Sequence, residues 1–217
     1  MRILAIGAHA DDVEIGCGGS LLRWSRLGHE LSICIVSDSA YRNPAGEEIR
    51  SSAAARAEAE QAAAMLKADL HIGTLPALHL AFGETLNAAL VEQIGRIRPD
   101  LVLSHWPGDS HADHAAVGLA TIHACRRVPR ILTYRSNWYA AADQFDARFY
   151  VDISREIDQK LRLVSLFAGE NARTGGSWLD WCRSEARTRG HAAGAEFAEA
   201  FGVVKWVAGL PAGSPDL

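Results

Sequence analysis

The chain has 217 residues, of which 48% are hydrophobic and 22% are charged, and these values are typical of one globular domain with a large core. The formal net charge of −4 is too small to indicate nucleic acid or an anionic membrane as a partner. No apolar run reaches the roughly 18 residues that a transmembrane helix needs, so we expect no membrane-spanning segment.

Strand and helix patterns alternate along the sequence. In chain order we expect a strand at 2–7, a helix at 17–27, a strand at 30–37, a polar loop at 38–47, a helix at 48–67, a strand at 69–72, a helix at 84–97, a strand at 100–105, a helix at 113–127, strands at 131–135 and 148–152, and helices at 154–168 and 177–189. This alternation is typical of a parallel sheet covered on both faces. The sequence therefore predicts a Rossmann-like α/β fold in a single domain, 1–217, with a flexible tail at 208–217.

The N-terminus and the cysteines bear on the cellular compartment. His9 and two aspartates interrupt the first segment before an apolar signal-peptide region can form. The four cysteines show no Cys-x-x-Cys spacing, and we interpret them as reduced, mostly buried thiols. We therefore expect a cytoplasmic protein.

Histidine and aspartate follow two of the expected strands. The apolar segment 3–6 runs directly into His9, Asp11 and Asp12, and the strand at 100–105 leads into a second acidic, histidine-rich segment at 105–114. Carboxylates are rarely buried unless they are paired or bind a metal. Open α/β sheets build their sites at the carboxyl ends of their strands, so both clusters are candidates for one active site.

Three of these side chains form a candidate metal site. His9 and Asp12 lie three residues apart in one turn, and His114 begins a helix after the other strand. If the two strands are neighbours, all three converge on one crevice. Catalytic zinc takes three nitrogen or oxygen ligands at roughly 2.0–2.2 Å and keeps one position open for water. The pattern therefore indicates one Zn²⁺ per chain, although such a ligand set also accepts other divalent ions.

The remaining polar residues of the clusters have candidate roles beside the metal. Asp11 is placed to take a proton from metal-activated water. His111 lies one helical turn before His114, where it can protonate the leaving nitrogen or stabilise an oxyanion. Asp109 can hydrogen-bond a histidine ring. For Asp113 we favour a structural interpretation, as a charge that complements a helix N-terminus.

The glycine-rich segment 14–19 allows a different interpretation. It is similar to the loop with which methyltransferases bind S-adenosylmethionine, and Asp38 lies where a ribose-binding acid would be expected. However, six residues separate the end of the first strand from Gly16. We prefer the structural interpretation, in which glycines allow the following helix to pack closely.

The two clusters strongly resemble the signatures of the LmbE-like, or PIG-L, family of zinc-dependent N-deacetylases. The signature Ala-His-Pro-Asp-Asp-x-Glu-x-Gly-x-Gly-Gly is matched at 8–19 with Ala10 for proline, and Pro-x-Asp-x-His-x-Asp-His at 107–114 with Ala112 where proline is common. Further segments similar to the family are Arg56-Ala57-Glu58, Arg189-Gly190 and Ala198-Glu199-Ala200-Phe201. The sequence departs from the family after Lys160, where a common Ser-Gln pair is replaced by the segment 167–171.

The resemblance implies roles for individual residues. His9, Asp12 and His114 would be zinc ligands, Asp11 the general base, and His111 the residue that stabilises the transition state or protonates the amine. The implied reaction removes an acyl group, usually acetyl, from the 2-amino group of a glucosamine-type sugar or its conjugate. Because many members form trimers or hexamers, the resemblance also implies a homo-oligomer, although the sequence identifies no interface.

Candidate substrate contacts come from aromatic residues and one arginine. Sugars stack their C–H faces on aromatic rings, and Trp106 lies beside the second cluster while Trp138 and Tyr139 follow the strand at 131–135. We name Trp106 and Tyr139 as candidates. Family analogy adds Arg56, for which an ion pair with Glu60 on the same helix is the structural alternative.

Other functions stay open at this point. They are a methyltransferase that uses Gly16–Gly19, a deacylase of a non-sugar amide, and a non-catalytic metal- or sugar-binding protein. Asp11 argues against the last, because binding alone does not need an unliganded acid beside the ion.

Overall fold

A computed structural model describes residues 1–208, so the tail predicted at 208–217 lies almost wholly outside the described residues. The strands are β1 (Arg2–Gly7), β2 (Glu30–Ser37), β3 (Tyr41–Arg42), β4 (Glu48–Arg50), β5 (Asp69–Leu75), β6 (Leu101–His105), β7 (Arg130–Tyr134), β8 (Phe149–Asp152) and β9 (Ala198–Trp206). The helices are α1 (Asp12–Arg26), α2 (Ser52–Leu66), α3 (Glu84–Ile97), α4 (Ala112–Ala124), α5 (Ile157–Ser165), α6 (Ala168–Arg173) and α7 (Ser177–Ala193). Among the described residues, no helix has both the length and the apolar character that crossing a bilayer requires.

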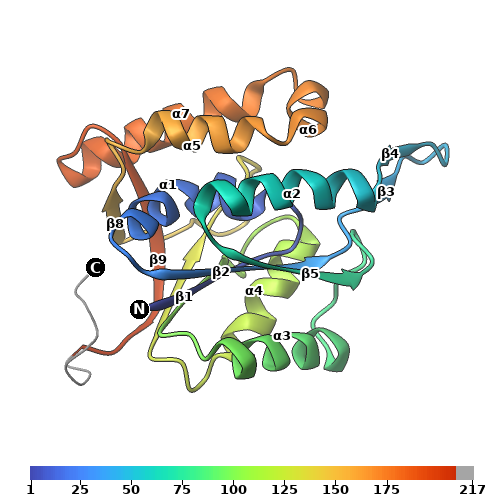
Figure 1. Cartoon of the computed structure of the whole chain (residues 1–217), viewed down its shortest axis with the longest axis horizontal. Helices are drawn as coiled ribbons and strands as arrows, with labels where there is room; N and C mark the ends of the chain where they lie inside the picture. Colours follow the sequence, from blue (N-terminus) through green and yellow to red (C-terminus); the bar gives the residue numbers. More distant parts are fainter. Residues whose placement is uncertain (209–217) are drawn as a thin grey trace.

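The core is a seven-stranded sheet in the order β5-β2-β1-β6-β7-β9-β8 (Figure 1). The pairs from β5 to β7 are parallel, and β9 and β8 extend the sheet in antiparallel fashion. This confirms the predicted α/β class with a mostly parallel sheet. The chain proceeds outward in one direction from β1 to β2 and in the other from β6 to β7, so the strand order reverses between β1 and β6. Ligands of open α/β sheets bind at such a switch point.

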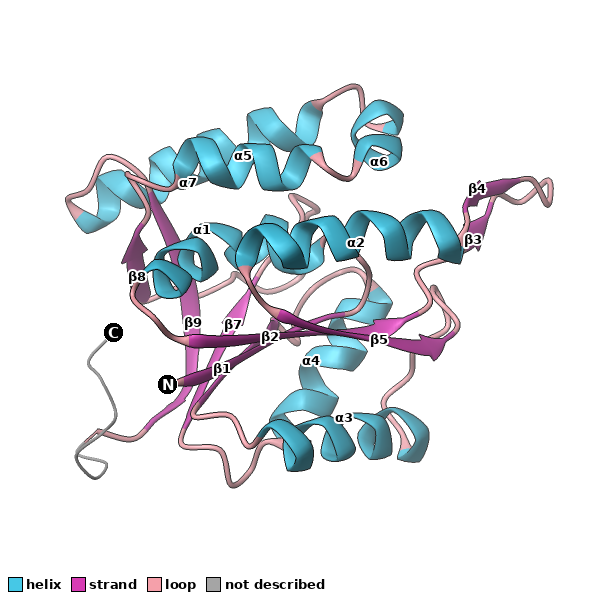
Figure 2. Ribbon diagram, viewed as in Figure 1, coloured by secondary structure: helices cyan, strands magenta, loops and turns pink. Residues whose placement is uncertain are grey.

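Helices cover both faces of the sheet (Figure 2). Helices α1, α2, α5 and α7 lie on one face, and α3 and α4 lie on the other. Strands covered on both sides have no polar face to present, which explains why every residue of β6 and β7 is buried. A separate apolar cluster fills each side of the sheet. The fold therefore fixes β1 and β6 rigidly, and the loops that follow them are anchored at their bases.

The structure differs from the sequence prediction in several regions: α1 begins at Asp12 and not at residue 17, and the short helix α6 was not predicted. Residues 38–50, expected as loop and helix, instead contain the small β3–β4 hairpin, and α2 begins only at Ser52, where the Ser51 hydroxyl accepts a hydrogen bond from the Ala54 amide at 3.1 Å. Strand β9 was not predicted, because Gly202 interrupts its apolar pattern. Residues expected as strand ends and helix ends elsewhere shift by a few positions.

Helix α1 begins at Asp12, so the glycines at 16, 18 and 19 lie inside a helix. They face close neighbours: a Cβ on Gly16 would lie 2.1 Å from a ring carbon of Tyr134. The Tyr134 ring is fully buried, and its hydroxyl donates to the Ile6 carbonyl at 2.7 Å. The glycines therefore serve close packing of α1 against the sheet, and they do not form the open loop that a methyltransferase would need.

This packing predicts the effect of two alanine substitutions. Gly16→Ala forces the Tyr134 ring or α1 to move, and we expect a loss of about 1–3 kcal/mol in the free energy of unfolding, measured by urea denaturation. The matched control is Gly95→Ala on α3, where the added Cβ meets nothing within 4 Å. This change should raise stability by up to about 1 kcal/mol through helix propensity. Equal stability of the two variants would contradict the close approach.

Candidate active site

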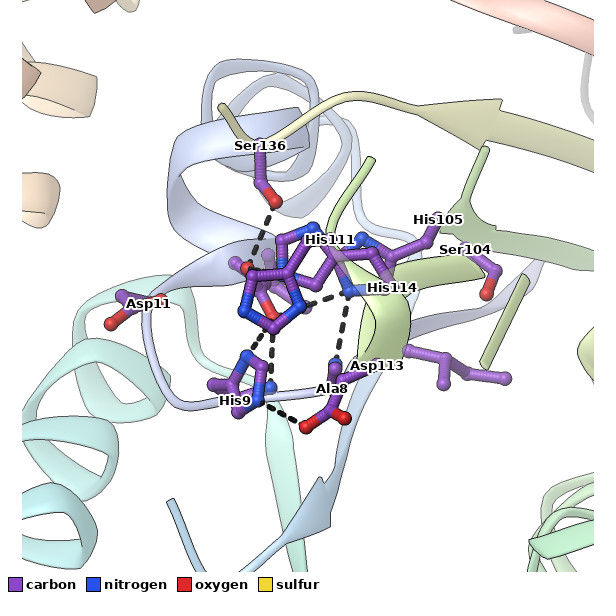
Figure 3. Close-up of polar contacts among 12 residues, drawn as sticks. Ala8, His9, Asp11, Ser104, His105, His111, Asp113, His114 and Ser136 are labelled. Atoms are coloured by element: carbon purple, nitrogen blue, oxygen red, sulfur yellow. Dashed lines mark hydrogen bonds and ion pairs between the residues drawn. The ribbon is translucent and has the colours of Figure 1, made fainter. Parts of the chain in front are cut away.

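The turns that follow β1 and β6 meet at the switch point. The Ala8 amide, just after β1, donates to the Nε2 of His105, the last residue of β6, at 3.0 Å. Figure 3 shows His9 on the first turn facing His111 and His114 on the second. Both clusters therefore lie in one site, because parallel strands end at the same edge.

The Asp12 carboxylate lies between two histidine rings. One oxygen, Oδ2, is 3.4 Å from His9 Nδ1, and the other, Oδ1, is 3.2 Å from His114 Nε2. Oδ1 also accepts a hydrogen bond from the Ser136 hydroxyl at 2.9 Å. Asp12 and His114 are buried. Asp12 thus faces a ring nitrogen of each of the two histidines that are expected to bind a metal with it.

Asp113 orients the His9 ring from behind. Its Oδ2 lies 2.9 Å from His9 Nε2, which leaves His9 Nδ1 directed at Asp12. The same carboxylate accepts backbone N–H groups of Leu78 at 2.7 Å and Leu80 at 3.1 Å. The helix-terminus interpretation of Asp113 is therefore incomplete, because the sequence does not reveal that His9 and the loop after β5 lie against this carboxylate.

Asp109 orients the His114 ring in the same way as Asp113 orients the His9 ring. Its Oδ2 lies 3.2 Å from His114 Nδ1, so His114 Nε2 is the nitrogen that faces Asp12. Asn137 donates to both Asp109 oxygens at 2.9 Å. Carboxylates behind metal-binding histidines fix the ring orientation and make the imidazole a better ligand.

His105 is an alternative ligand that the geometry disfavours. Within the described residues, two groups of donor atoms lie close enough to share an ion: His9 with His111 and His114, and Asp12 with His105 and His114. Each group holds two of the three predicted ligands, and the complete predicted set is neither of them. The His105 Nε2 also accepts the Ala8 amide, so its lone pair is already engaged. Its ring is stacked on His114 with centroids 4.1 Å apart. His105 therefore serves as a buried support for the site.

The charges of these groups fit a divalent cation. Burial lowers the pKa of His9, but hydrogen bonds with Asp113 and Asp12 outweigh this effect, so the pKa rises to about 9. Burial is likewise outweighed at His114, where Asp12 and Asp109 raise the pKa to about 10. Both shifts arise because the carboxylates beside the two rings favour positive charge there. Two ring nitrogens and one carboxylate are a donor set typical of a mononuclear catalytic site.

Asp11 lies beside this site in a strained conformation. Its φ of 123° falls in a region that L-residues rarely adopt, and its side chain is buried. The Arg50 guanidinium holds it, because Nη1 donates to Asp11 Oδ2 and to the Ala10 carbonyl, both at 2.9 Å. Burial and the neighbouring Asp12 raise the pKa of Asp11, Arg50 opposes them, and the result is about 7. A carboxyl with this pKa is suited to proton transfer near neutral pH.

Arg50 is a site residue that the sequence analysis missed. Its Nη2 donates to Glu58 on α2 at 2.7 Å, so it links the β3–β4 hairpin to both the helix and Asp11. Arg56, the arginine named from the sequence, is exposed, and its Nη1 lies 3.8 Å from Oε1 of Glu60 on the same helix. The structure does not bring Arg56 to the site. An unpredicted hairpin carries Arg50, so no sequence pattern placed it there.

His111 faces the same site from the start of α4. Its ring is stacked on His114 with centroids 4.2 Å apart, and its buried Nδ1 has no hydrogen-bond partner within residues 1–208. Burial lowers the pKa of His111, and His114 and His9 lower it further. His111 therefore favours the neutral form, and it lines the cavity described below.

A cavity of about 200 Å³ opens above these residues. Its floor contains His9, Asp11, Asp12, His111 and His114. Its walls contain the aromatic residues Tyr41, Trp138, Tyr139 and Trp178 and the charged residues Arg50, Glu170 and Arg173. Tyr139 thus lies at the cavity as expected, whereas Trp106 does not line it and instead packs against Phe145 with ring centroids 5.5 Å apart.

Comparisons with known proteins relate the chain to one family. The family described as PIG-L, GlcNAc-PI de-N-acetylase, matches residues 4–125, which include both clusters. Two relatives are the uncharacterized deacetylase YaiS of Escherichia coli, 29% identical over 65% of this chain and 78% of that protein, and diacetylchitobiose deacetylase of Thermococcus kodakarensis, 25% identical over 96% and 84%. The conserved protein TT1542 from Thermus thermophilus has the same fold, with a TM-score of 0.80, 24% identity and coverage of 96% and 97%.

The chain belongs to the PIG-L family, and relatives in this family are named deacetylases. The resemblance noted in the two signatures is therefore confirmed.

Glu14 is a further buried carboxyl near the site, on the first turn of α1. Burial, together with the nearby Asp11 and Asp12, raises its pKa from 4.5 to about 8. The folded protein therefore keeps this proton up to about pH 8, whereas the unfolded chain releases it above its ordinary value. Its contribution to stability is complete at acidic pH and is lost as the pH rises through about 8.

We predict that Glu14→Gln flattens the pH dependence of stability. Between about pH 5 and pH 8 the wild-type protein should lose free energy of unfolding relative to this variant, because the variant has no proton to release in the unfolded state. Urea titrations at several pH values measure the difference. Glu60→Gln, which removes an exposed carboxylate, should follow the wild-type curve. Parallel curves for wild type and Glu14→Gln would contradict the raised pKa.

Proposed function

We propose that this protein is a zinc-dependent hydrolase that removes the N-acetyl group from an amino sugar or an amino-sugar conjugate. The contacts of Asp12 with His9 and His114, beside the buried acid Asp11 that is not needed as a ligand, carry the proposal. Membership of the PIG-L family and the relative that deacetylates diacetylchitobiose support it.

His9, Asp12 and His114 would hold the ion. When bound, a divalent cation supplies Lewis acidity, which makes an acetamide carbonyl more electrophilic and water more acidic. Asp109 and Asp113 keep the two rings in the orientation that directs their free nitrogens at Asp12. The ligand geometry is thus set before substrate arrives.

Asp11 is the proposed general base. Arg50 holds one of its oxygens, and the other carboxylate oxygen is left to take a proton from the attacking water. The water oxygen forms a bond to the acetamide carbon, and the C–N bond then breaks. The proton taken up by Asp11 is returned to the leaving nitrogen, so the products are acetate and the free amine.

His111 is the proposed oxyanion partner. Its neutral ring lies at the cavity floor, where an N–H can donate to the carbonyl oxygen as negative charge develops on it. Removal of a single donor of this kind from an enzyme typically costs about 100- to 1,000-fold in rate.

An amino sugar fits the walls of the cavity. Trp138 and Tyr139 line the cavity with 40% and 51% of their surface exposed, so their aromatic rings are accessible to a ligand. The C–H face of a sugar ring can cover such a surface, while its hydroxyls bond to the polar wall residues. We propose Tyr139 as a substrate contact on this basis.

The direct test is acetate release from a panel of N-acetylated compounds. We expect enzyme loaded with zinc, but not chelated enzyme, to release acetate from N-acetylglucosamine or its β-linked conjugates. Simple non-sugar acetamides in the same panel test whether the sugar is required. Absence of acetate from every compound at full zinc occupancy would contradict the proposed reaction.

Asp11→Asn tests the base. We expect zinc content to stay near that of the wild type, because Asp11 is not a ligand, while kcat falls by roughly 100- to 10,000-fold. Metal analysis and initial rates on the same preparation measure both quantities. An Asp11→Asn enzyme with near wild-type kcat would exclude Asp11 as the base.

His9→Ala and His114→Ala test the ligand set. Each variant loses one of three protein ligands, so we expect zinc bound after dialysis to fall to a small fraction of the wild-type amount. His191→Ala removes an exposed histidine of α7 and serves as the control with unchanged zinc content. Retention of zinc by both site variants would show that the ion is held elsewhere.

A further inference from the structure

Both arginines that line the cavity are already paired with carboxylates. Arg50 donates to Asp11 and Glu58. Arg173 donates to Glu170 Oε2 through Nε at 2.9 Å and through Nη2 at 2.6 Å. A negatively charged group that enters the cavity therefore finds Arg50 engaged through both Nη atoms and Arg173 engaged through Nε and Nη2.

Glu170 is the centre of the outer wall. Its side chain is 6% exposed, and its Oε1 accepts a hydrogen bond from the Tyr41 hydroxyl at 2.7 Å. Tyr41 pairs with Arg50 across the β3–β4 hairpin, and Arg50 donates to Asp11. The Tyr41–Glu170 hydrogen bond therefore connects α6 to the residue pair that contacts Asp11. Figure 1 shows α6 and the hairpin on the same side of the molecule. Glu170 also lies in the segment 167–171, where the sequence departs from the family pattern.

This wall disfavours anions for two reasons. Three carboxylates line the cavity, namely Asp11, Asp12 and Glu170. An anion that takes Arg173 away from Glu170 also leaves a buried carboxylate without its cation, and such an unpaired charge is costly. An uncharged hydroxyl has no such cost, because it can donate to Glu170 or accept from Arg173 while their ion pair remains intact.

We propose that Glu170 makes this site selective for uncharged N-acetylated sugars and conjugates, and against those that carry a phosphate or carboxylate next to the acetamido ring. The proposal rests on the proposed function. It assigns the specificity to the Tyr41–Glu170–Arg173 wall, at some remove from the residues that carry out the hydrolysis.

Substitution of Glu170 tests the proposal. The measurement is kcat/KM for N-acetylglucosamine and for N-acetylglucosamine 6-phosphate, compared as a ratio so that any general effect on catalysis cancels. We expect the wild type to prefer the neutral sugar, and Glu170→Gln, which frees Arg173, to shift the ratio about tenfold towards the phosphate, mainly through KM. Glu60→Gln removes an equal charge on the outer face of α2 and should leave the ratio unchanged.

A second variant keeps the proposal testable if Glu170→Gln fails to fold. Arg173→Met removes the cation and leaves Glu170 in place, so we expect the preference for the neutral sugar to increase. Thermal unfolding identifies variants that are folded. A folded Glu170→Gln enzyme with the wild-type ratio, or an Arg173→Met enzyme whose ratio shifts towards the phosphate, would overturn the proposal.

Binding separates this proposal from the proposed function. Trp138 and Trp178 line the cavity, so tryptophan fluorescence can follow binding of the same two sugars without turnover. A wild-type enzyme that releases acetate from neither sugar would contradict the deacetylase assignment for these substrates. The fluorescence titrations would still decide the charge selectivity, since a Kd ratio that is equal in wild type and Glu170→Gln would exclude a role for Glu170.

Discussion

The carboxylate of Asp12 joins the two halves of the site. It lies at the start of α1, after the turn that follows β1, and its contacts reach His114 on α4, His105 at the end of β6 and Ser136 after β7. Each contact depends on the parallel pairing of β1, β6 and β7, because only that register brings the three strand ends together. A buried carboxylate with so many histidine neighbours would be costly without compensating positive charge. The arrangement is therefore best explained by a cation, supplied either by protons or by a metal ion.

The residues around Asp12 form a layered arrangement. Asp109 and Asp113 orient the rings from behind, while Arg50 holds Asp11 at a φ of 123° in front. Strain of this kind persists only where the surrounding structure enforces it. The hairpin that carries Arg50 also carries Tyr41, which contacts α6 across the cavity wall. The position of the proposed base and the shape of the substrate wall thus depend on the same short hairpin.

The sequence predicted the parts of the site that follow from strand periodicity. His9, Asp12 and His114 could be found because each stands just beyond a buried strand, and the family signatures reinforced this pattern. Arg50 was not found, since the alanine-rich segment 48–67 was predicted as helix throughout, whereas its first residues form the second strand of a hairpin. Arg56 was named instead, although helical geometry alone could not show that it points to solvent. The antiparallel strand β9 was missed for a similar reason, because its pairing depends on contacts far apart in the sequence.

The most direct test of this account is the position of the bound metal. Crystals grown with zinc and measured on both sides of the zinc absorption edge would locate the ion without reference to activity. We predict one anomalous peak per chain, within bonding distance of His9 Nδ1, an Asp12 oxygen and His114 Nε2, with Asp11 beside it but not coordinated. A peak coordinated by His105 in place of His9, or no peak in this crevice, would contradict the central claim.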